Sequence, residues 1–191
     1  MSMCMWFNAP VTTPLSGPPM QYDSRELERR FERLKVLVVD DEPFMRKVVR
    51  TLLTGMGVRT IMEAPDGLAG LETIRRDQPD VVVLDWNMPG LDGPAFVRMV
   101  RSPQTFPMPD IPIIMLTGHG ERAKVIEAIE IGVNEFLLKP VSTKALRDRM
   151  AAVLLNPRPN IRVDQYYGPA PRKLSEIHRD ADDAATMVFL N

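Results

Sequence analysis

The segment VVVLDWNMPG, residues 81–90, decides how the rest of the chain is interpreted. Four apolar residues lead directly into Asp85, and a Met-Pro-Gly turn follows. A short β-branched run of this kind is typical of a strand buried in a parallel sheet. A carboxylate at the end of such a strand costs free energy unless it is paired, hydrated or bound to a cation. Asp85 is therefore a candidate functional residue.

Strand and helix patterns alternate outward from this segment. Five apolar runs of strand length are each followed by an amphipathic segment of helical period. This order predicts an α/β fold with a doubly wound, five-stranded parallel sheet and helices on both faces. The expected strands are 35–40, 58–64, 80–85, 112–117 and 134–138, and the expected helices are 43–56, 66–77, 93–101, 121–131 and 142–155.

Helical spacing also predicts which side chains of these helices face the core. Apolar residues that recur every three or four positions form one stripe along a helix, and that stripe is normally buried. The residues expected to be buried are Phe44, Val48, Leu52 and Met56 in the first helix of the repeat, Leu68, Leu71 and Ile74 in the second, and Val125, Ile126 and Ile129 in the fourth.

Composition limits the classes of function. The chain has 191 residues, 45% of them hydrophobic and 26% charged, which is typical of one soluble globular domain with extensions. A formal net charge of -1 gives no reason to expect nucleic acid or a membrane as a partner. Cys4 is the single cysteine, no apolar run approaches the roughly 18 residues of a membrane span, and residues 1–22 lack the pattern expected of a secretory signal. These features predict a cytoplasmic protein.

The chain divides into four expected parts. Residues 1–22 are predicted to be a flexible Pro-rich segment, and residues 23–34 a short lead-in helix with a capping-box pattern at its start. Residues 35–155 contain the strand and helix repeats. Residues 156–191 are expected to form a C-terminal arm with no output domain. Two possibilities remain open for the apolar part of this arm, packing over the domain or disorder; its apolar residues are Ile161, Val163, Tyr166 and Tyr167.

Polar residues stand where four of the expected strands end. Asp40 and Asp41 follow the first strand, Asp85 ends the third, Thr117 ends the fourth, and Lys139 follows the fifth. Parallel strands place these ends at one edge of the sheet, where ligands of such folds bind. Carboxylates there suit Mg²⁺, and an ammonium and a hydroxyl beside a carboxylate nucleophile suit phosphoryl transfer. Each residue alone is an ordinary helix cap or loop residue, but the combination predicts that Asp85 becomes an aspartyl phosphate.

The same residues resemble those of a known family, the receiver domain of two-component response regulators. The string DWNMPGLDG is similar to the phosphoacceptor loop of chemotaxis-type, single-domain receivers. The resemblance covers residues 34–155 and implies a flavodoxin-like receiver fold with strand order 2-1-3-4-5. The residues that carry it are Asp40 and Asp41, Asp85, Thr117, and Lys139 followed by Pro140.

The resemblance implies both a donor and a cofactor. The phosphoryl group would come to Asp85 from a histidine kinase or a histidine phosphotransfer protein. Mg²⁺ would be held by Asp41, Asp85 and the backbone carbonyl of Asn87, with Asp40 acting through water. The downstream partner is a protein that the sequence does not name.

The resemblance also implies a switch. Lys139 would contact the phosphoryl oxygens after a cis peptide bond to Pro140, and Thr117 and Phe136 would move inward together. Phenylalanine stands at 136 where many chemotaxis-type relatives have tyrosine, so a tyrosine hydroxyl is not part of this switch. His119 occupies one of the positions that tune dephosphorylation in the family, and we expect His119→Ala to alter the lifetime of the phosphoryl group.

Four other functional classes compete with this interpretation. A haloacid-dehalogenase-type phosphatase needs a second acid two residues after the nucleophile, where this chain has Asn87. A flavodoxin-like flavin-binding protein is disfavoured, because Asp40 and Asp41 in the first loop would repel the flavin phosphate. A P-loop motif is absent. A receiver-like scaffold that works without phosphorylation is the remaining alternative. We expect a signalling phosphoacceptor rather than an enzyme, with self-phosphorylation from small donors and slow self-dephosphorylation.

Overall fold

The computed structural model of the chain describes residues 24–118 and 122–170. The predicted Pro-rich segment, Asp23 of the lead-in helix and residues 171–191 of the arm lie outside the described residues. The elements in chain order are α1 (Ser24–Arg33), β1 (Lys35–Val39), α2 (Pro43–Gly55), β2 (Thr60–Ala64), α3 (Gly67–Asp77), β3 (Val81–Asp85), α4 (Gly93–Val100), β4 (Ile113–Thr117), α5 (Arg122–Glu130), β5 (Glu135–Leu138), α6 (Thr143–Leu155), β6 (Asn160–Val163) and β7 (Tyr166–Pro169).

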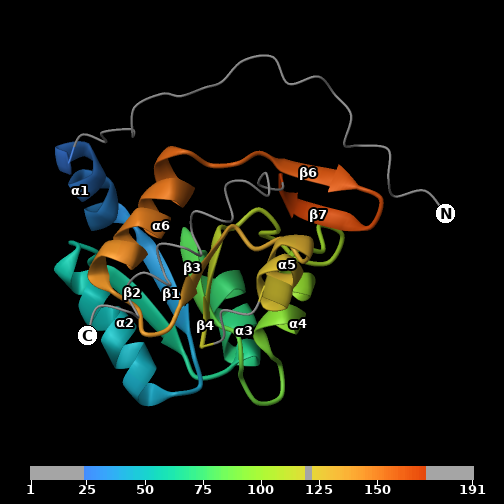
Figure 1. Cartoon of the computed structure of the whole chain (residues 1–191), viewed down its shortest axis with the longest axis horizontal. Coiled ribbons are helices and arrows are strands. Elements are labelled where there is room, and N and C mark those ends of the chain that lie inside the picture. The colour runs from blue at the N-terminus through green and yellow to red at the C-terminus, as the bar shows by residue number, and fades with distance from the viewer. Residues whose placement is uncertain (1–23, 119–121, 171–191) are drawn as a thin grey trace.

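Strands β1 to β5 form one parallel sheet with the order β2-β1-β3-β4-β5, which confirms the predicted topology (Figure 1). The central strand β3 is buried along its whole length, as its apolar run predicts. The register pairs Val39 with Leu84, Asp85 with Leu116 and Thr117 with Leu138. The carboxyl ends of the strands therefore lie level with one another at the lower edge of the sheet in Figure 1.

Two apolar cores cover the two faces of the sheet. Helices α1, α2 and α6 pack on one face, and α3, α4 and α5 pack on the other (Figure 1). Phe31 from α1 and Phe96 from α4 are fully buried in these two cores. Complete burial of such a side chain contributes about 1.5–3 kcal/mol. The lead-in helix is therefore part of the packed domain, and Leu27 and Leu34 are buried beside Phe31.

The predicted buried face of α2 is wrong at its first residue. Phe44 is 69% exposed, and Val48 and Leu52 are only partly buried. Residues spaced by four drift by about 40° per step around a helix of 3.6 residues per turn, so Phe44 does not share a face with the end of the stripe. The buried residues of α2 are Val49 and Leu53, and Met56, the last residue of the predicted stripe, is buried just after the helix.

Two further predictions of burial are also wrong. Leu68 in the first turn of α3 is 64% exposed and Ile126 of α5 is 38% exposed, while Leu71, Ile74 and Val125 are buried as expected. The first turns of α2 and α3 begin beyond the carboxyl ends of the strands. Apolar side chains there have no sheet beneath them to cover. None of the described helices is long and apolar enough to span a bilayer.

Part of the C-terminal arm forms an antiparallel hairpin, β6–β7, beside the upper end of α5 (Figure 1). Arg158 donates hydrogen bonds to the carbonyl groups of Asn134 and Ala170. The Tyr167 hydroxyl and the Asn160 side-chain amide both donate to the Asp110 carboxylate. Of the two possibilities that the sequence left open, the described part of the arm therefore takes the first, because it packs against the domain.

A buried arginine lies between the domain and this hairpin. Arg101 donates to the carbonyl oxygens of Gly132, Pro109 and Ile111 and to the side-chain oxygen of Asn134, at 2.9, 2.5, 2.8 and 2.7 Å. Burial lowers the pKa of Arg101 to about 10, so the side chain stays charged at neutral pH. The guanidinium thus joins the end of α4, the loop before β4 and the turn after α5.

We predict that Arg101→Met lowers the free energy of unfolding by about 3 kcal/mol, because it leaves buried carbonyl groups without a donor. Urea denaturation followed by circular dichroism measures the change. Arg76→Met is the matched control, because Arg76 is 72% exposed and pairs with its neighbour Asp77; its effect should stay within about 0.5 kcal/mol. Equal effects of the two substitutions would contradict the role given to Arg101.

Candidate functional site

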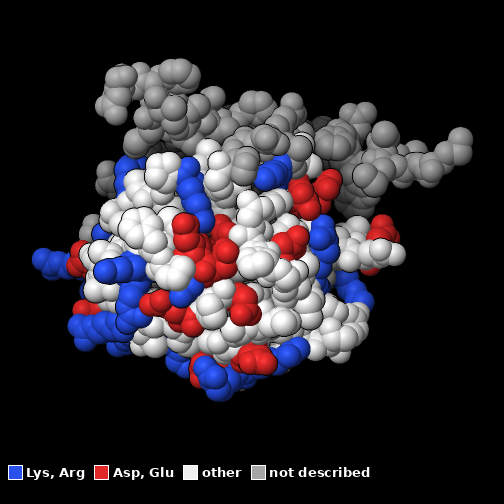
Figure 2. All heavy atoms as spheres, turned by 90° about the horizontal axis from the view of Figure 1, so that it is seen from below, with Lys and Arg blue, Asp and Glu red and all other residues white. Residues whose placement is uncertain are grey.

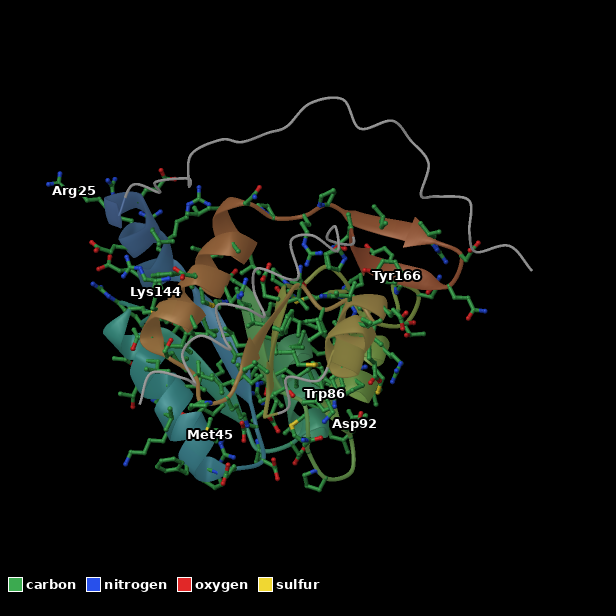
Figure 3. All side chains as sticks on the ribbon, in the orientation of Figure 1. Arg25, Met45, Trp86, Asp92, Lys144 and Tyr166 are labelled. Atoms are coloured by element: carbon green, nitrogen blue, oxygen red, sulfur yellow. The ribbon has the colours of Figure 1, made fainter. Side chains whose placement is uncertain are left out.

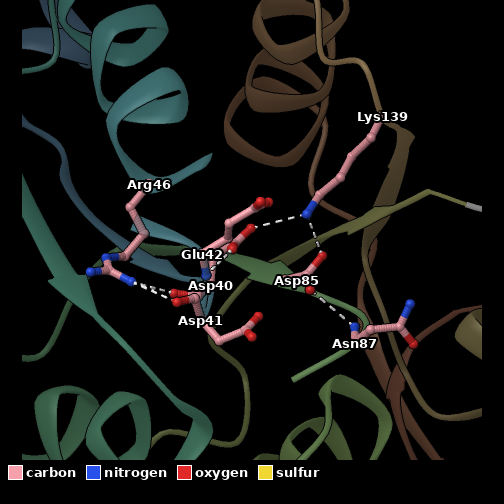
Figure 4. A network of polar contacts seen from close by, with 7 residues as sticks. All are labelled: Asp40, Asp41, Glu42, Arg46, Asp85, Asn87 and Lys139. Atoms are coloured by element: carbon pink, nitrogen blue, oxygen red, sulfur yellow. Dashed lines mark hydrogen bonds and ion pairs between the residues drawn. The ribbon is translucent and has the colours of Figure 1, made fainter. Parts of the chain in front are cut away.

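Four of the predicted residues meet at the carboxyl edge of the sheet (Figure 4). Asp40 and Asp41 follow β1, Asp85 ends β3 and Lys139 follows β5. The three aspartates each offer a carboxylate oxygen, and these oxygens lie within 4.8 Å of one another. Asp40 and Asp85 are buried, whereas Asp41 is exposed. The acidic cluster is therefore formed by residues that the sequence separates by more than forty positions.

Lys139 bridges the two buried carboxylates. Its Nζ lies 2.7 Å from Asp85 Oδ1 and 3.1 Å from Asp40 Oδ2. Its backbone N–H donates to the carbonyl of Thr117 at 2.7 Å, and the peptide bond to Pro140 is cis, as the resemblance implies. One ammonium among three carboxylates leaves a formal charge of -2. This remaining charge suits a divalent cation.

Backbone amides fix the second oxygen of each buried carboxylate. The N–H of Glu42 donates to Asp40 Oδ1 at 2.9 Å, and the N–H of Asn87 donates to Asp85 Oδ2 at 3.1 Å. Each carboxylate is therefore oriented by one amide and by Lys139 before any cation arrives. Carboxylate and carbonyl oxygens are the ligands that Mg²⁺ prefers, so the donor set fits this ion.

Burial and neighbouring charges act in opposite directions on Asp85 and Lys139. Burial raises the pKa of Asp85, Lys139 lowers it, Asp40 raises it, and the result is a raised pKa. For Lys139, burial lowers the pKa, but Asp85 and Asp40 raise it, and the result is again a raised pKa. Lys139 therefore keeps its charge at neutral pH, while the ionised form of Asp85 is held in the fold against a desolvation cost.

The predicted switch residues lie on the two neighbouring strands. Thr117 is buried at the end of β4, and Phe136 on β5 is half-buried and pairs with Met115 in the register. His119 lies outside the described residues. The structure thus brings Thr117 next to the site through its backbone contact with Lys139.

The loop that follows Asp85 folds back closely on it. Gly93 donates its N–H to the carbonyl of Trp86 at 2.9 Å, and Asp92 caps α4 by accepting the N–H of Ala95 at 2.8 Å. Trp86 and Asp92 are labelled in Figure 3. A Cβ atom on Gly93 would lie 2.5 Å from the carbonyl oxygen of Asp85. The close approach of these two backbone segments therefore requires glycine at this position.

Two sets of contacts beside the site were not predicted from the sequence. Trp86 is buried in the core, and Lys124 of α5 places its Nζ 5.7 Å from the centre of the indole ring. On the other side, Arg46 donates to the backbone carbonyl of Asp40, and Glu63 at the end of β2 pairs with Arg46 and Arg50. These contacts depend on residues meeting across the fold, which no local pattern reports.

Acidic side chains gather at the carboxyl edge of the sheet, which contains the cluster Asp40, Asp41 and Asp85. Seen from that edge, Asp and Glu side chains gather near the middle of the face, and Lys and Arg surround them (Figure 2). Such an arrangement attracts cations to the centre of the face. The geometry and charge together fit a site for a divalent cation beside a buried carboxylate.

Comparison with known proteins identifies the family. A family model for the response regulator receiver domain matches residues 36–151. The chain belongs to the response regulator receiver domain family. It is therefore a module of two-component signalling, as the resemblance in the sequence predicts. Receiver domains are generally Mg²⁺-dependent, in agreement with the acidic cluster Asp40, Asp41 and Asp85.

Several chemotaxis proteins are similar to this receiver domain. Chemotaxis protein CheY-3 of Vibrio cholerae is 34% identical over 119 residues, which cover 62% of this chain and 90% of that protein. Chemotaxis protein CheY1 of Helicobacter pylori is 37% identical over 122 residues, which cover 63% of this chain and 97% of that protein. These relatives support the chemotaxis-type resemblance.

Solved structures agree with the sequence relatives. The structure of chemotaxis protein CheY4 of Vibrio cholerae matches with a TM-score of 0.57 and 32% identity, covering 63% of this chain and 98% of that chain. The receiver domain of the Francisella response regulator 1452 matches with a TM-score of 0.58 and 30% identity, covering 63% and 96%. The predicted receiver fold is thereby confirmed.

We predict that Gly93→Ala lowers the free energy of unfolding by about 1–3 kcal/mol, since the added methyl group forces the loop away from Asp85. Thermal or urea denaturation measures the effect. Gly55→Ala at the end of α2 is the control, because a Cβ there meets nothing within 4 Å. If Gly93→Ala is as well tolerated as Gly55→Ala, the loop does not need the close approach.

We predict that Asp85→Asn stabilises the metal-free protein at neutral pH. A raised folded-state pKa means that the contribution of Asp85 to stability is present below the pKa of the unfolded chain and is lost as the pH rises through the folded-state value. Asparagine removes this loss, so its advantage should shrink as the pH falls through the folded-state pKa. Urea denaturation at a series of pH values measures the difference.

Asp148→Asn is the matched control for this substitution, because Asp148 is 57% exposed in a surface pair with Lys144. It should change stability little at any pH, because exposed ion pairs contribute little. A lower stability of Asp85→Asn at neutral pH would show that the contact with Lys139 outweighs the cost of burying the carboxylate.

Proposed function

We propose that the chain is a phosphoacceptor response regulator in which Asp85 is phosphorylated with the help of Mg²⁺. One observation carries this proposal: a buried carboxylate ends the central strand, lies 2.7 Å from Lys139 Nζ and shares its surroundings with two further acids. The phosphorylated form then switches protein–protein interactions or passes the phosphoryl group on.

The transfer step needs groups that neutralise charge. A carboxylate oxygen of Asp85 forms the new bond to phosphorus while the bond from phosphorus to the donor breaks. Lys139 is placed to pair with a phosphoryl oxygen once the charge of Asp85 is used in the new bond. Asp41, Asp85 and the carbonyl of Asn87 would hold Mg²⁺ directly, and Asp40 through water. The bound ion supplies positive charge to the phosphoryl oxygens.

The switch follows from the same residues. Thr117 ends β4, the strand beside Asp85, and Phe136 lies on β5, the next strand of the sheet. These are the residues that we expect to move after phosphorylation. Their movement would change the surface formed by α5, β5 and α6, because a local charge can bias a packing equilibrium. We infer that the donor is a histidine kinase or a histidine phosphotransfer protein and that the target is another protein.

We infer that the chain acts in the cytoplasm as a signalling component rather than as an enzyme for a separate substrate. Its own chemistry would be self-phosphorylation from small phosphodonors and slow self-dephosphorylation. Neither nucleic acid nor a membrane is proposed as a partner, since the net charge is -1 and no described helix spans a bilayer.

The test is intact mass after incubation with acetyl phosphate and Mg²⁺. We expect the wild type to gain the mass of one phosphoryl group, and to gain none without Mg²⁺ or as Asp85→Asn. Asp148→Asn is the control and should be phosphorylated like the wild type. A mass gain on Asp85→Asn would contradict the assignment of the acceptor. No gain on the wild type, even with a kinase, would favour a scaffold that works without phosphorylation.

A further inference from the structure

The first turn of α2 contains an arginine that contacts the backbone of the acidic cluster. Arg46 Nη1 lies 2.8 Å from the carbonyl oxygen of Asp40 and 3.4 Å from that of Asp41 (Figure 4). These carbonyl groups belong to the two residues whose carboxylates extend into the site. The contact is therefore made to the backbone of these two residues and not to their carboxylate oxygens.

The same guanidinium is anchored on the neighbouring strand. Arg46 Nε lies 3.6 Å from Glu63 Oε2, and the second oxygen of Glu63 is held by Arg50 at 2.6 Å. Glu63 belongs to β2, which pairs with β1 directly beneath the acidic loop. The side chain of Arg46 is 16% exposed, whereas that of Arg50 is 52% exposed. Arg46 is thus enclosed between the loop and β2.

We propose that Arg46 is a positioning residue, which fixes the backbone of Asp40 and Asp41 so that their carboxylates are arranged for a divalent cation before it binds. The inference rests on the proposed function, since it concerns the Mg²⁺ site of that function. It adds a residue that touches neither the ion nor the phosphoryl group. Residues that orient metal ligands in this way commonly change metal affinity by 10–100-fold.

The direction of the change in Mg²⁺ affinity on removal of Arg46 distinguishes a positioning role from an effect of its charge alone. Arg46 is a cation near a cation site, so its charge alone repels Mg²⁺, and its removal should tighten binding. Removing the contacts of Arg46 with the backbone should weaken Mg²⁺ binding, because the loop then loses conformational entropy when the ion binds. The two roles therefore predict opposite changes in the dissociation constant.

The experiment compares Arg46→Met, Arg46→Lys and Arg50→Met with the wild type, using calorimetric titration of Mg²⁺ without a phosphodonor. We expect Arg46→Met to raise the dissociation constant roughly tenfold. Arg46→Lys keeps the charge but cannot bridge two carbonyl groups and Glu63, so we expect a smaller rise of about threefold. Arg50→Met removes an equal charge from the same cluster and should stay within about twofold of the wild type or bind slightly tighter.

Amide hydrogen exchange in the metal-free protein gives an independent measurement. The N–H of Glu42 donates to Asp40 Oδ1, so its protection reports whether the loop is held. We expect faster exchange of this amide in Arg46→Met and an unchanged rate in Arg50→Met. At saturating Mg²⁺ the rate of phosphorylation by acetyl phosphate should return toward the wild-type rate, which a general loss of folding would not allow.

The outcomes distinguish the inference from the proposed function. If the wild type binds Mg²⁺ but Arg46→Met binds it as well or more tightly, Arg46 acts only through its charge and the inference fails alone. If Arg46→Lys binds Mg²⁺ with the wild-type dissociation constant, a positive charge at this position is sufficient for wild-type affinity. The positioning role of the guanidinium is then wrong. If the wild type binds no Mg²⁺, the proposed function fails, and the inference fails with it.

Discussion

Repulsion among three carboxylates at one edge of the sheet is the constraint on which the rest of this structure depends. Their oxygens lie within 4.8 Å of one another. Two ionised carboxylates at such a distance repel by about 3 kcal/mol at an effective dielectric constant of 20. Lys139 offsets part of this repulsion through contacts with Asp40 and Asp85. The remaining charge is what makes the site a place for a cation and for phosphoryl transfer.

The fold holds these charges together by packing the strands that carry them between two cores. Each strand that leads to the site is apolar and lies between two cores, so the strands cannot slip without exposing buried side chains. Backbone amides then orient the buried carboxylates, and the close approach of Gly93 to Asp85 fixes the loop between them. The packing of the two cores thus offsets the electrostatic repulsion among the carboxylates at this edge.

The opposite edge of the sheet is organised by a different interaction. Arg101 is buried there and donates to backbone carbonyl groups from two segments of the chain, the loop before β4 and the turn after α5. The β6–β7 hairpin packs nearby through Arg158 and Tyr167. A charge at this edge stabilises the connections between elements, because its partners are neutral acceptors already held in place. The two edges therefore use buried charge in different ways, one for structure and one for chemistry.

The sequence by itself determined the parallel sheet and the four charged residues of the site, and its resemblance to receiver domains implied the strand order. The apolar runs predict buried strands, and the polar residues that follow them, Asp40, Asp85 and Lys139, mark where the strands end. Both features are local and can be recognised along the chain. Only the tertiary structure decided that Phe44 and Leu68 are exposed, that part of the arm packs as a hairpin, and that Arg46 and Glu63 join the site. These features depend on which segments meet across the fold, and contacts between distant segments leave no periodicity in the sequence.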